Sequence, residues 1–154
     1  MKVLIVDSGK CIGCRLCELV CSFVHEHVIN PSKARLRVIR LHDEPVDVPV
    51  FCLQCGLCVS VCPVNAISRD PKLGCITIDY DKCVGCKRCI QVCPYGAIFV
   101  NPDTGKPMIC DLCGGNPACV NVCPTGALEY LPIESAAQHK RVTYARLLAR
   151  TQPT

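Results

Sequence analysis

The sequence has few of the residues that usually build a hydrophobic core. It holds no Trp, three Phe and four Tyr, whereas cysteine makes up 17 of its 154 residues. Hydrophobic residues amount to 50%, but without the cysteines they fall to about 39%. Small chains with so little apolar surface usually need disulfides or metal to fold, so we expect the cysteines to supply the missing stability.

Long apolar runs are absent as well. No stretch approaches 18 apolar residues, and only four consecutive apolar residues precede Asp7. Such a start is too short for a signal-peptide core, and nothing in the sequence predicts a membrane-spanning helix. We therefore expect a cytoplasmic protein without direct membrane insertion, with export on a signal-bearing partner left open. A reducing cytosol and an odd cysteine count argue against a disulfide framework.

The sequence also lacks a strong charge of one sign and a catalytic constellation of its own. Its formal charge is +4, and Lys and Arg are scattered rather than gathered in a run. Without a basic stripe or a helix-turn-helix pattern, nucleic-acid binding is not expected. No Ser-His-Asp set, carboxylate pair or phosphate loop is visible, so we expect no catalysis by the chain alone.

What the sequence does contain is cysteine at regular spacing. The first three of four groups follow C-x2-C-x2-C-x3-C, and the fourth has a lengthened x5 gap before its last x3 pair. Only Cys75 is left over. The groups are Cys11, Cys14, Cys17, Cys21; Cys52, Cys55, Cys58, Cys62; Cys83, Cys86, Cys89, Cys93; and Cys110, Cys113, Cys119, Cys123.

This spacing is typical of bacterial two-cluster ferredoxins. The first three cysteines lie on one tight loop and bind one 4Fe-4S cluster, while the fourth, expected to start a helical turn, ligates another cluster. Structural zinc prefers two separated CxxC pairs around one ion, so it fits the spacing poorly. Four groups of four predict four 4Fe-4S clusters. With thiolate ligands each cluster carries −2, which would change the formal charge from +4 to about −4.

Similar sequence motifs end the three later groups and form an internal repeat. VCPVNAI at residues 61–67, VCPYGAI at 92–98 and VCPTGAL at 122–128 each predict a short helix, a turn and a strand, with a small Ala close to a cluster. Residues 66–81 predict two short strands around a turn at Asp70 to Gly74. Residues 52–100 therefore resemble a complete two-cluster ferredoxin.

Groups one and four are the two atypical groups, and they bracket this inner ferredoxin. We therefore expect them to pair with each other. Sequential pairing, of group one with two and of three with four, remains the alternative. The nested ligand sets are Cys11, Cys14, Cys17 with Cys123 for cluster one; Cys52, Cys55, Cys58 with Cys93 for cluster two; Cys83, Cys86, Cys89 with Cys62 for cluster three; and Cys110, Cys113, Cys119 with Cys21 for cluster four.

The expected fold class is α+β, with two nested two-cluster ferredoxin-like modules. Residues 1–130 form the double domain: an inner module at 52–100, an outer module at 1–21 plus 101–130, and an insertion at 22–51. Residues 35–41 and 46–50 predict a β-hairpin whose Arg face is solvated or packed on a partner. Residues 131–154 predict a C-terminal helical tail with Val142, Ala145, Leu148 and Ala149 on one face, docked on its own domain or on a larger subunit.

Three conspicuous residues are not needed as ligands. Cys75 lies in the alternating stretch CITID at residues 75–79, which predicts a small buried thiol in a strand. His25 and His27 stand two residues apart, a spacing that does not present both to one metal from a helix. We expect them to face solvent or to support neighbouring ligands.

From Cys11 to about Leu128 the chain resembles the four-cluster ferredoxin-like electron-transfer subunits of multisubunit oxidoreductases. Within this class, CELVCSFVHE at residues 17–26 and NPSKAR at 30–35 look most like the small subunit of tungsten-dependent aldehyde oxidoreductases, with benzoyl-coenzyme A reductase subunits similar. The resemblance also implies the nested ligation. It further implies a large catalytic partner, most simply a tungsten-pterin subunit, and an acceptor subunit or ferredoxin.

The sequence therefore predicts an electron carrier that relays electrons between a catalytic subunit and an acceptor. Other catalytic partners of the class are formate dehydrogenase, hydrogenase, carbon monoxide dehydrogenase and benzoyl-coenzyme A reductase. Rival hypotheses are a free polyferredoxin and an iron–sulfur sensor that binds nucleic acid. Self-association through one end of the cluster chain is a further expectation. The sequence does not identify the substrate, the direction of electron flow or the cluster potentials.

Overall fold

The computed structural model describes residues 1–43 and 45–151, in which short helices lie among four separate two-stranded antiparallel sheets. This mixture confirms the α+β class. The strands are β1 (Lys2–Val6), β2 (Leu36–Leu41), β3 (Val46–Phe51), β4 (Ile67–Arg69), β5 (Ile76–Ile78), β6 (Phe99–Val100), β7 (Pro107–Met108) and β8 (Leu128–Pro132). The α-helices are α1 (Leu16–Glu26), α2 (Leu57–Ser60), α3 (Arg88–Val92), α4 (Ala118–Asn121) and α5 (Ile133–Thr151), and the 3-10 turns are η1 (Ser8–Lys10), η2 (Pro31–Lys33) and η3 (Leu112–Gly115).

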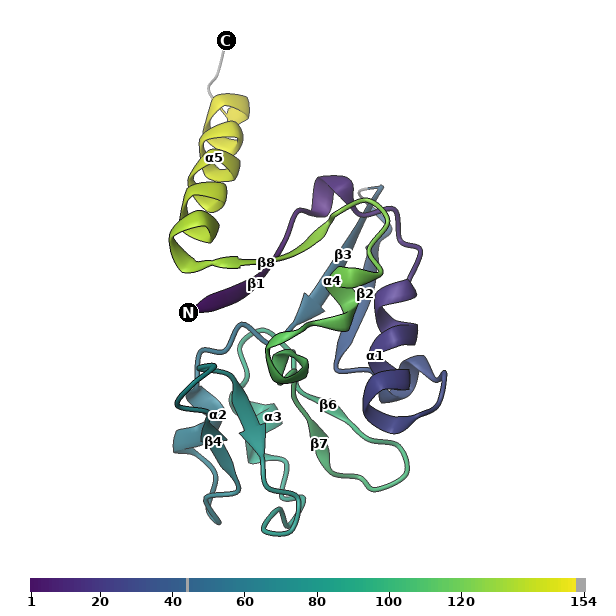
Figure 1. Cartoon of the computed structure of the whole chain (residues 1–154), viewed down its shortest axis with the longest axis vertical. Helices are drawn as coiled ribbons and strands as arrows, with labels where there is room; N and C mark the ends of the chain where they lie inside the picture. The colour runs from purple at the N-terminus through teal and green to yellow at the C-terminus, as the bar shows by residue number, and fades with distance from the viewer. Residues whose placement is uncertain (44, 152–154) are drawn as a thin grey trace.

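Strand β1 ties the beginning of the chain to its last strand. It pairs antiparallel with β8, with Lys2 opposite Pro132 and Val6 opposite Leu128. Figure 1 shows the two strands side by side where α5 begins. The sequence predicts no strand at residues 2–6, because the partner of this short apolar stretch lies at the other end of the chain and leaves no local signal.

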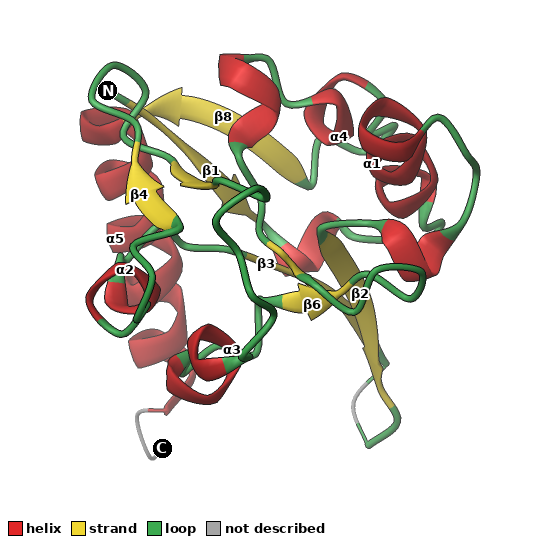
Figure 2. Cartoon of the chain, turned by 90° about the horizontal axis from the view of Figure 1, so that it is seen from below, coloured by secondary structure: helices red, strands yellow, loops and turns green. Residues whose placement is uncertain are grey.

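The two hairpins expected from alternation are present. Strands β2 and β3 pair with Leu36 opposite Phe51, and Figure 2 shows this hairpin extending on the side away from α5. Strands β4 and β5 pair with Ile67 opposite Ile78. The turn between them is fixed by the Asp70 carboxylate, which accepts the backbone N–H groups of residues 72 and 73 at 2.8 Å each.

The arginines of the β2 hairpin differ from the expectation. Arg35 and Arg37 fold onto the chain instead of facing solvent or a partner. The Arg35 side chain is only 12% exposed, and the Arg37 guanidinium lies 4.7 Å from the centre of the Phe99 ring. Arg40 is exposed and pairs with Asp47 through two hydrogen bonds of 3.1 and 2.8 Å.

The helices begin earlier in each cysteine group than expected. The fourth cysteine was predicted to start a helical turn, but the third cysteine already lies inside the helix, as Cys58 does in α2 and Cys89 in α3. Each of these helices follows a left-handed residue, Gly56 or Lys87, that turns the chain directly into the first turn. The fourth cysteine then follows the helix end, except in the longer α1, where Cys21 is internal.

Four of the helices gather in two pairs. Helix α1 packs against α4, and α2 packs against α3. Figure 1 shows α1 and α4 beside the β2–β3 hairpin near the middle of the molecule, and α2 and α3 beside β4 at the lower left. Cysteine groups one and four are therefore neighbours, as are groups two and three.

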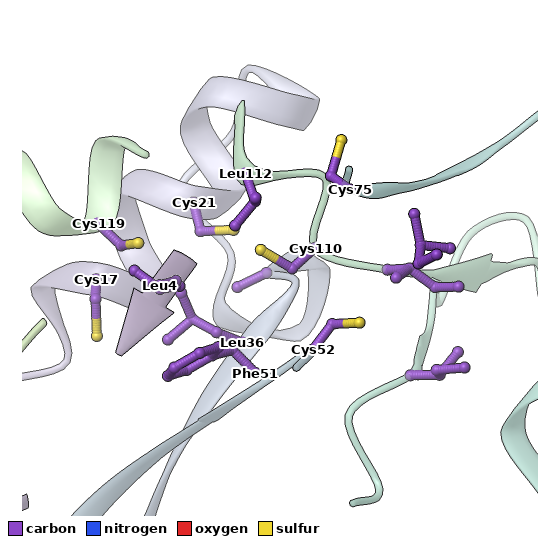
Figure 3. Packing of buried hydrophobic residues seen from close by; sticks show 14 of the residues in the cluster. Leu4, Cys17, Cys21, Leu36, Phe51, Cys52, Cys75, Cys110, Leu112 and Cys119 are labelled. Atoms are coloured by element: carbon purple, nitrogen blue, oxygen red, sulfur yellow. The ribbon is translucent and has the colours of Figure 1, made fainter. Parts of the chain in front are cut away.

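Cysteine contributes a large share of the core, which contains few other large side chains. Eight of the 19 buried residues in the main described cluster are cysteines, and they pack with aliphatic residues such as Leu4, Leu36 and Leu112 and with Phe51. Figure 3 shows Cys21, Cys110 and Cys119 among these side chains. The repeat alanines, Ala66, Ala97 and Ala127, are buried to 1–2% exposure as expected.

The C-terminal tail forms the predicted helix, α5. Its first turns contact β1 and β8, and Ala136 is buried there. Val142 and Ala145 are exposed, while the side chains of Leu148 and Ala149 and the whole of residues 152–154 lie outside what the structure describes. Within the described part of the chain, no helix is both long and apolar enough to span a membrane.

Candidate cluster-binding sites

The first three cysteine groups share one backbone conformation. The residues on either side of the second cysteine adopt positive φ, at Gly13 and Arg15, at Gln54 and Gly56, and at Gly85 and Lys87. Left-handed residues at such close spacing curl a loop into a concavity that suits an anionic group. The three cysteines of each group therefore line the inside of a tight loop.

The first loop closes one small cavity. Its walls include Cys11, Cys14 and Cys17, and the fourth sulfur there belongs to Cys123, more than 100 residues further along the chain. The remaining walls are mainly apolar, with Ile12, Leu16, Val38, Pro49, Ala127 and Leu128.

The second and third loops close two further cavities in the same way. Cysteines of the second group meet Cys93 of the third, and cysteines of the third group meet Cys62 of the second. The structure thus brings together one crossed pair of sets: Cys52, Cys55, Cys58 with Cys93, and Cys83, Cys86, Cys89 with Cys62.

The fourth set is the most buried. Cys21 comes from α1, Cys119 from α4, and Cys110 and Cys113 from the segment around η3. Burial, together with the nearby charges of Cys119 and Cys21, raises the pKa of the Cys110 thiol well above its usual value. Figure 3 shows the Cys21 and Cys110 sulfurs close together beside Leu112.

The thiol pKa values shift in opposite directions at different cysteines. Burial raises the pKa of Cys17 and Cys119 to about 12 and that of Cys58 to about 11. At Cys62 and Cys123 the backbone N–H groups of the following turn outweigh burial and lower the pKa. Converging sulfurs, apolar walls and N–H donors to sulfur fit a thiolate-ligated cluster, and metal binding would displace the protons of the buried thiols.

A polar network that the sequence analysis missed lies against the fourth set. Asp111 accepts hydrogen bonds from His25 Nε2 at 3.0 Å and from Arg35 Nη1 at 2.6 Å. Burial raises the pKa of Asp111, but these two cationic neighbours hold it below its usual range. The signal was available in the sequence, because Asp111 follows the first cysteine of its group where the other groups have Ile12, Leu53 or Val84.

Gln54 links the two halves of the molecule. Its side-chain amide donates to the carbonyl oxygen of Cys110 at 2.7 Å and accepts the backbone N–H of Ile76 at 2.7 Å. The loop of group two is thereby fastened to group four and to β5. No local pattern marks Gln54, since its partners are 56 and 22 residues away.

The remaining sequence candidates have structural surroundings. Cys75 is buried just before β5, and the charges acting on its thiol come from Asp70, Asp111 and Arg69 rather than from other cysteines. His25 also faces the Cys21 carbonyl oxygen at 2.9 Å, which agrees with the expected supporting role. His27 ends α1 in a left-handed conformation.

Comparison with protein families identifies the cysteine-rich segments. Three family models, each described as a 4Fe-4S dicluster domain, match residues 10–67, 51–97 and 75–124. The matches overlap, and together they span all four cysteine groups.

Individual relatives are components of redox systems. The chain is similar to the polyferredoxin-like subunit of an aliphatic sulfonate oxidoreductase from Pyrococcus furiosus, with 41% identity over 111 residues that cover 71% of this chain and 64% of the relative. It is also similar to formate hydrogenlyase subunit 2 of Escherichia coli, with 43% identity over 70 residues that cover 44% of this chain and 34% of the relative. The chain therefore spans less than two thirds of either relative.

A solved structure is similar along most of the chain. It is a chain of the active site complex BamBC of benzoyl coenzyme A reductase, in complex with 1,5-dienoyl-CoA. The alignment has 30% identity and a TM-score of 0.52, and it covers 84% of this chain and 75% of that chain.

Proposed function

On the premise that this chain carries 4Fe-4S dicluster ferredoxin domains, we propose that it is the electron-transfer subunit of an oxidoreductase complex. One observation carries the proposal. Within the described residues, three groups of cysteines on tight loops are each completed by a cysteine from a distant group, and four of the other five cysteines, Cys21, Cys110, Cys113 and Cys119, lie close together. This arrangement is suited to multiple 4Fe-4S clusters.

The nested ligand sets have the better geometric support. A sequential pairing would complete the first loop with Cys62, whereas Cys123 lines the cavity at that loop. We therefore assign cluster one to Cys11, Cys14, Cys17 and Cys123; cluster two to Cys52, Cys55, Cys58 and Cys93; cluster three to Cys83, Cys86, Cys89 and Cys62; and cluster four to Cys110, Cys113, Cys119 and Cys21.

Contacts between the sets suggest an order for the four centres. The charge of Cys17 in set one raises the pKa of Cys119 in set four, and the charge of Cys58 in set two raises the pKa of Cys89 in set three. Gln54, between Cys52 and Cys55, bonds to the Cys110 carbonyl and joins sets two and four. The order one, four, two, three follows, which places sets one and three at the ends.

The protein and the clusters have separate tasks. When bound, each cluster supplies a one-electron redox centre. The chain ligates it, donates backbone N–H groups to sulfur and excludes water with side chains such as Val38 and Leu128. These contributions set the reduction potential and require no catalytic group on the chain, so substrate turnover belongs to a partner.

The partner proposed is a large catalytic subunit of the tungsten-pterin type, as in aldehyde oxidoreductases. The two relatives, a subunit of an aliphatic sulfonate oxidoreductase and a chain of the BamBC complex, support a catalytic oxidoreductase partner. The tungsten-pterin type rests on the resemblance of residues 17–26 and 30–35. Formate dehydrogenase, hydrogenase and carbon monoxide dehydrogenase are the other partners of the class.

Anaerobic purification of the tagged chain from its native cells tests the proposal. Iron, sulfide, tungsten, molybdenum and nickel are measured in the purified material. We expect about sixteen irons per chain, together with tungsten and a large subunit at constant stoichiometry. Molybdenum or nickel in place of tungsten would indicate a different catalytic partner, and the electron-transfer role would stand. Full iron content without any partner would favour a free polyferredoxin, and zinc in place of iron would refute the assignment.

A further inference from the structure

Arg35 holds an unusual position beside the fourth cysteine set. Its backbone N–H points to the Cys21 sulfur at 3.2 Å. At the far end of the side chain, Nη1 donates to the Asp111 carboxylate at 2.6 Å and reaches the Ile109 carbonyl at 3.5 Å. Residues 109 and 111 flank Cys110, so the Arg35 side chain runs from Cys21 to Cys110, two cysteines of the same set.

The Nε atom between these two anchors has no hydrogen-bond partner. It is buried, and it is the one buried side-chain nitrogen or oxygen left unpaired among the described residues. A buried donor left unsatisfied is unfavourable, and such a donor commonly marks the place of a bound water, ion or cofactor. Sulfur is the acceptor that the neighbouring ligand set would bring.

We propose that Arg35 Nε donates a hydrogen bond to a sulfur of the fourth cluster, and that Arg35 thereby raises the reduction potential of this cluster. The inference rests on the proposed function, because it requires a cluster held by Cys21, Cys110, Cys113 and Cys119. Hydrogen bonds to sulfur and buried positive charge both stabilise the more negative reduced cluster. In the order proposed above, this cluster is an interior one, so Arg35 would set how long an electron resides in the middle of the relay.

The other buried charges nearby do not remove this effect. Asp111 offsets part of the Arg35 charge, but it also receives a hydrogen bond from His25. Arg37, two residues further along the chain, donates its guanidinium hydrogen bonds to the carbonyl oxygens of residues 32, 34 and 36. Arg35 is therefore the arginine whose donor is left for the cluster.

The potential of the fourth cluster in variants of the full chain tests the proposal. Its signal is identified first, as the electron paramagnetic resonance signal that a Cys113→Ser variant changes. Arg35→Met removes charge and donor and is expected to shift the reduction equilibrium at least tenfold toward the oxidised form, which equals 59 mV for one electron. Arg35→Lys keeps the charge near Asp111 but loses Nε, so a smaller shift in the same direction is expected. Arg141→Met, an exposed charge on α5, is the matched control and should shift nothing.

A second measurement uses the unaltered chain, in case Arg35→Met fails to assemble. Protein labelled with [ε-¹⁵N]arginine should show a ¹⁵N coupling to the reduced fourth cluster in pulsed electron paramagnetic resonance, and Arg35→Lys should abolish it. If Arg35→Lys holds four clusters with an unchanged potential, and the unaltered chain shows no ¹⁵N coupling, the role of Arg35 is overturned. The proposed ligand sets would not be affected by that result. Fewer than four clusters in the unaltered chain, or no signal that responds to Cys113→Ser, would instead refute the proposed ligand sets.

Discussion

Burial alone does not distinguish a ligand cysteine from a packing cysteine in this chain. Cys58 and Cys75 are 5% and 2% exposed. Their neighbours differ, because burial and the charges of Cys52, Cys55 and Cys93 raise the pKa of Cys58, while the main charges acting on Cys75 are those of Asp70, Asp111 and Arg69. Other sulfurs nearby therefore mark a ligand, which is the same criterion that the spacing provided.

The two cysteines should respond differently to removal. Cys58→Ser is expected to lose cluster two, about four of sixteen irons, and to weaken the fold because ligation and folding share free energy. Cys75→Ser should keep its full iron, since its sulfur only fills space. Iron and acid-labile sulfide per chain provide the measurement. An equal iron loss in both variants would contradict the ligand assignment.

Gln54 is a second single residue with consequences beyond its own loop. Gln54→Ala leaves the Ile76 N–H and the Cys110 carbonyl without partners, and each buried unsatisfied group costs about 1–3 kcal/mol. We expect the visible absorbance of the clusters to be lost at a lower guanidinium concentration under anaerobic conditions. Gln138→Ala, an exposed glutamine on α5, is the control and should behave as the unaltered chain.

At the scale of elements, the β2–β3 hairpin packs closely against the first cysteine loop. A Cβ built on Gly13 would lie 2.5 Å from Oδ2 of Asp47 on β3, whereas one built on Gly85 meets nothing within 4 Å. Both glycines have nearly the same φ, +67° and +70°, and occupy the same place in their motifs. They differ only in whether another element packs against the loop.

Alanine at the two glycines should therefore separate backbone strain from packing. Each substitution places a side chain in the left-handed region, which costs roughly 1–2 kcal/mol. Gly13→Ala also displaces Asp47, which Arg40 holds through two hydrogen bonds, so it is expected to lower the occupancy of cluster one. Gly85→Ala should keep cluster three. The iron content of the two purified variants is the measurement. Equal losses of iron would show that the contact between Asp47 and the loop at Gly13 is unimportant.

How far the elements could be predicted depended on how local their signals were. Alternation marked β2, β3, β4 and β5, and the cysteine spacing marked the loops. The pairing of β1 with β8 and the bridge made by Gln54 join distant segments, and neither has a local signature. The inward position of Arg35 was missed because an arginine on an alternating hairpin face ordinarily points to solvent, and here Asp111 draws it inside.

Across the whole molecule, cysteines share the core with a small set of apolar side chains. Its largest fully buried side chains include Leu36, Ile76 and Met108, which alone would make a thin interior. Helices α2, α3 and α4 have only four or five residues, too few to be stable without tertiary packing or ligation. We therefore expect assembly of the clusters and folding to be one process at this scale, as in small metal-dependent domains.

The net charge of the molecule should follow this assembly. The chain without metal has a formal charge of +4 and a sequence pI of about 8.3, so at pH 7 it migrates toward the cathode. Each oxidised cluster with four thiolates adds −2, so four clusters give about −4 and reverse the direction of migration. Anaerobic capillary electrophoresis during stepwise chelation of iron should resolve species two charges apart, and the number of steps counts the clusters. Two or three steps instead of four would contradict the proposed count, and continued cathodic migration of the fully loaded chain would contradict thiolate ligation itself.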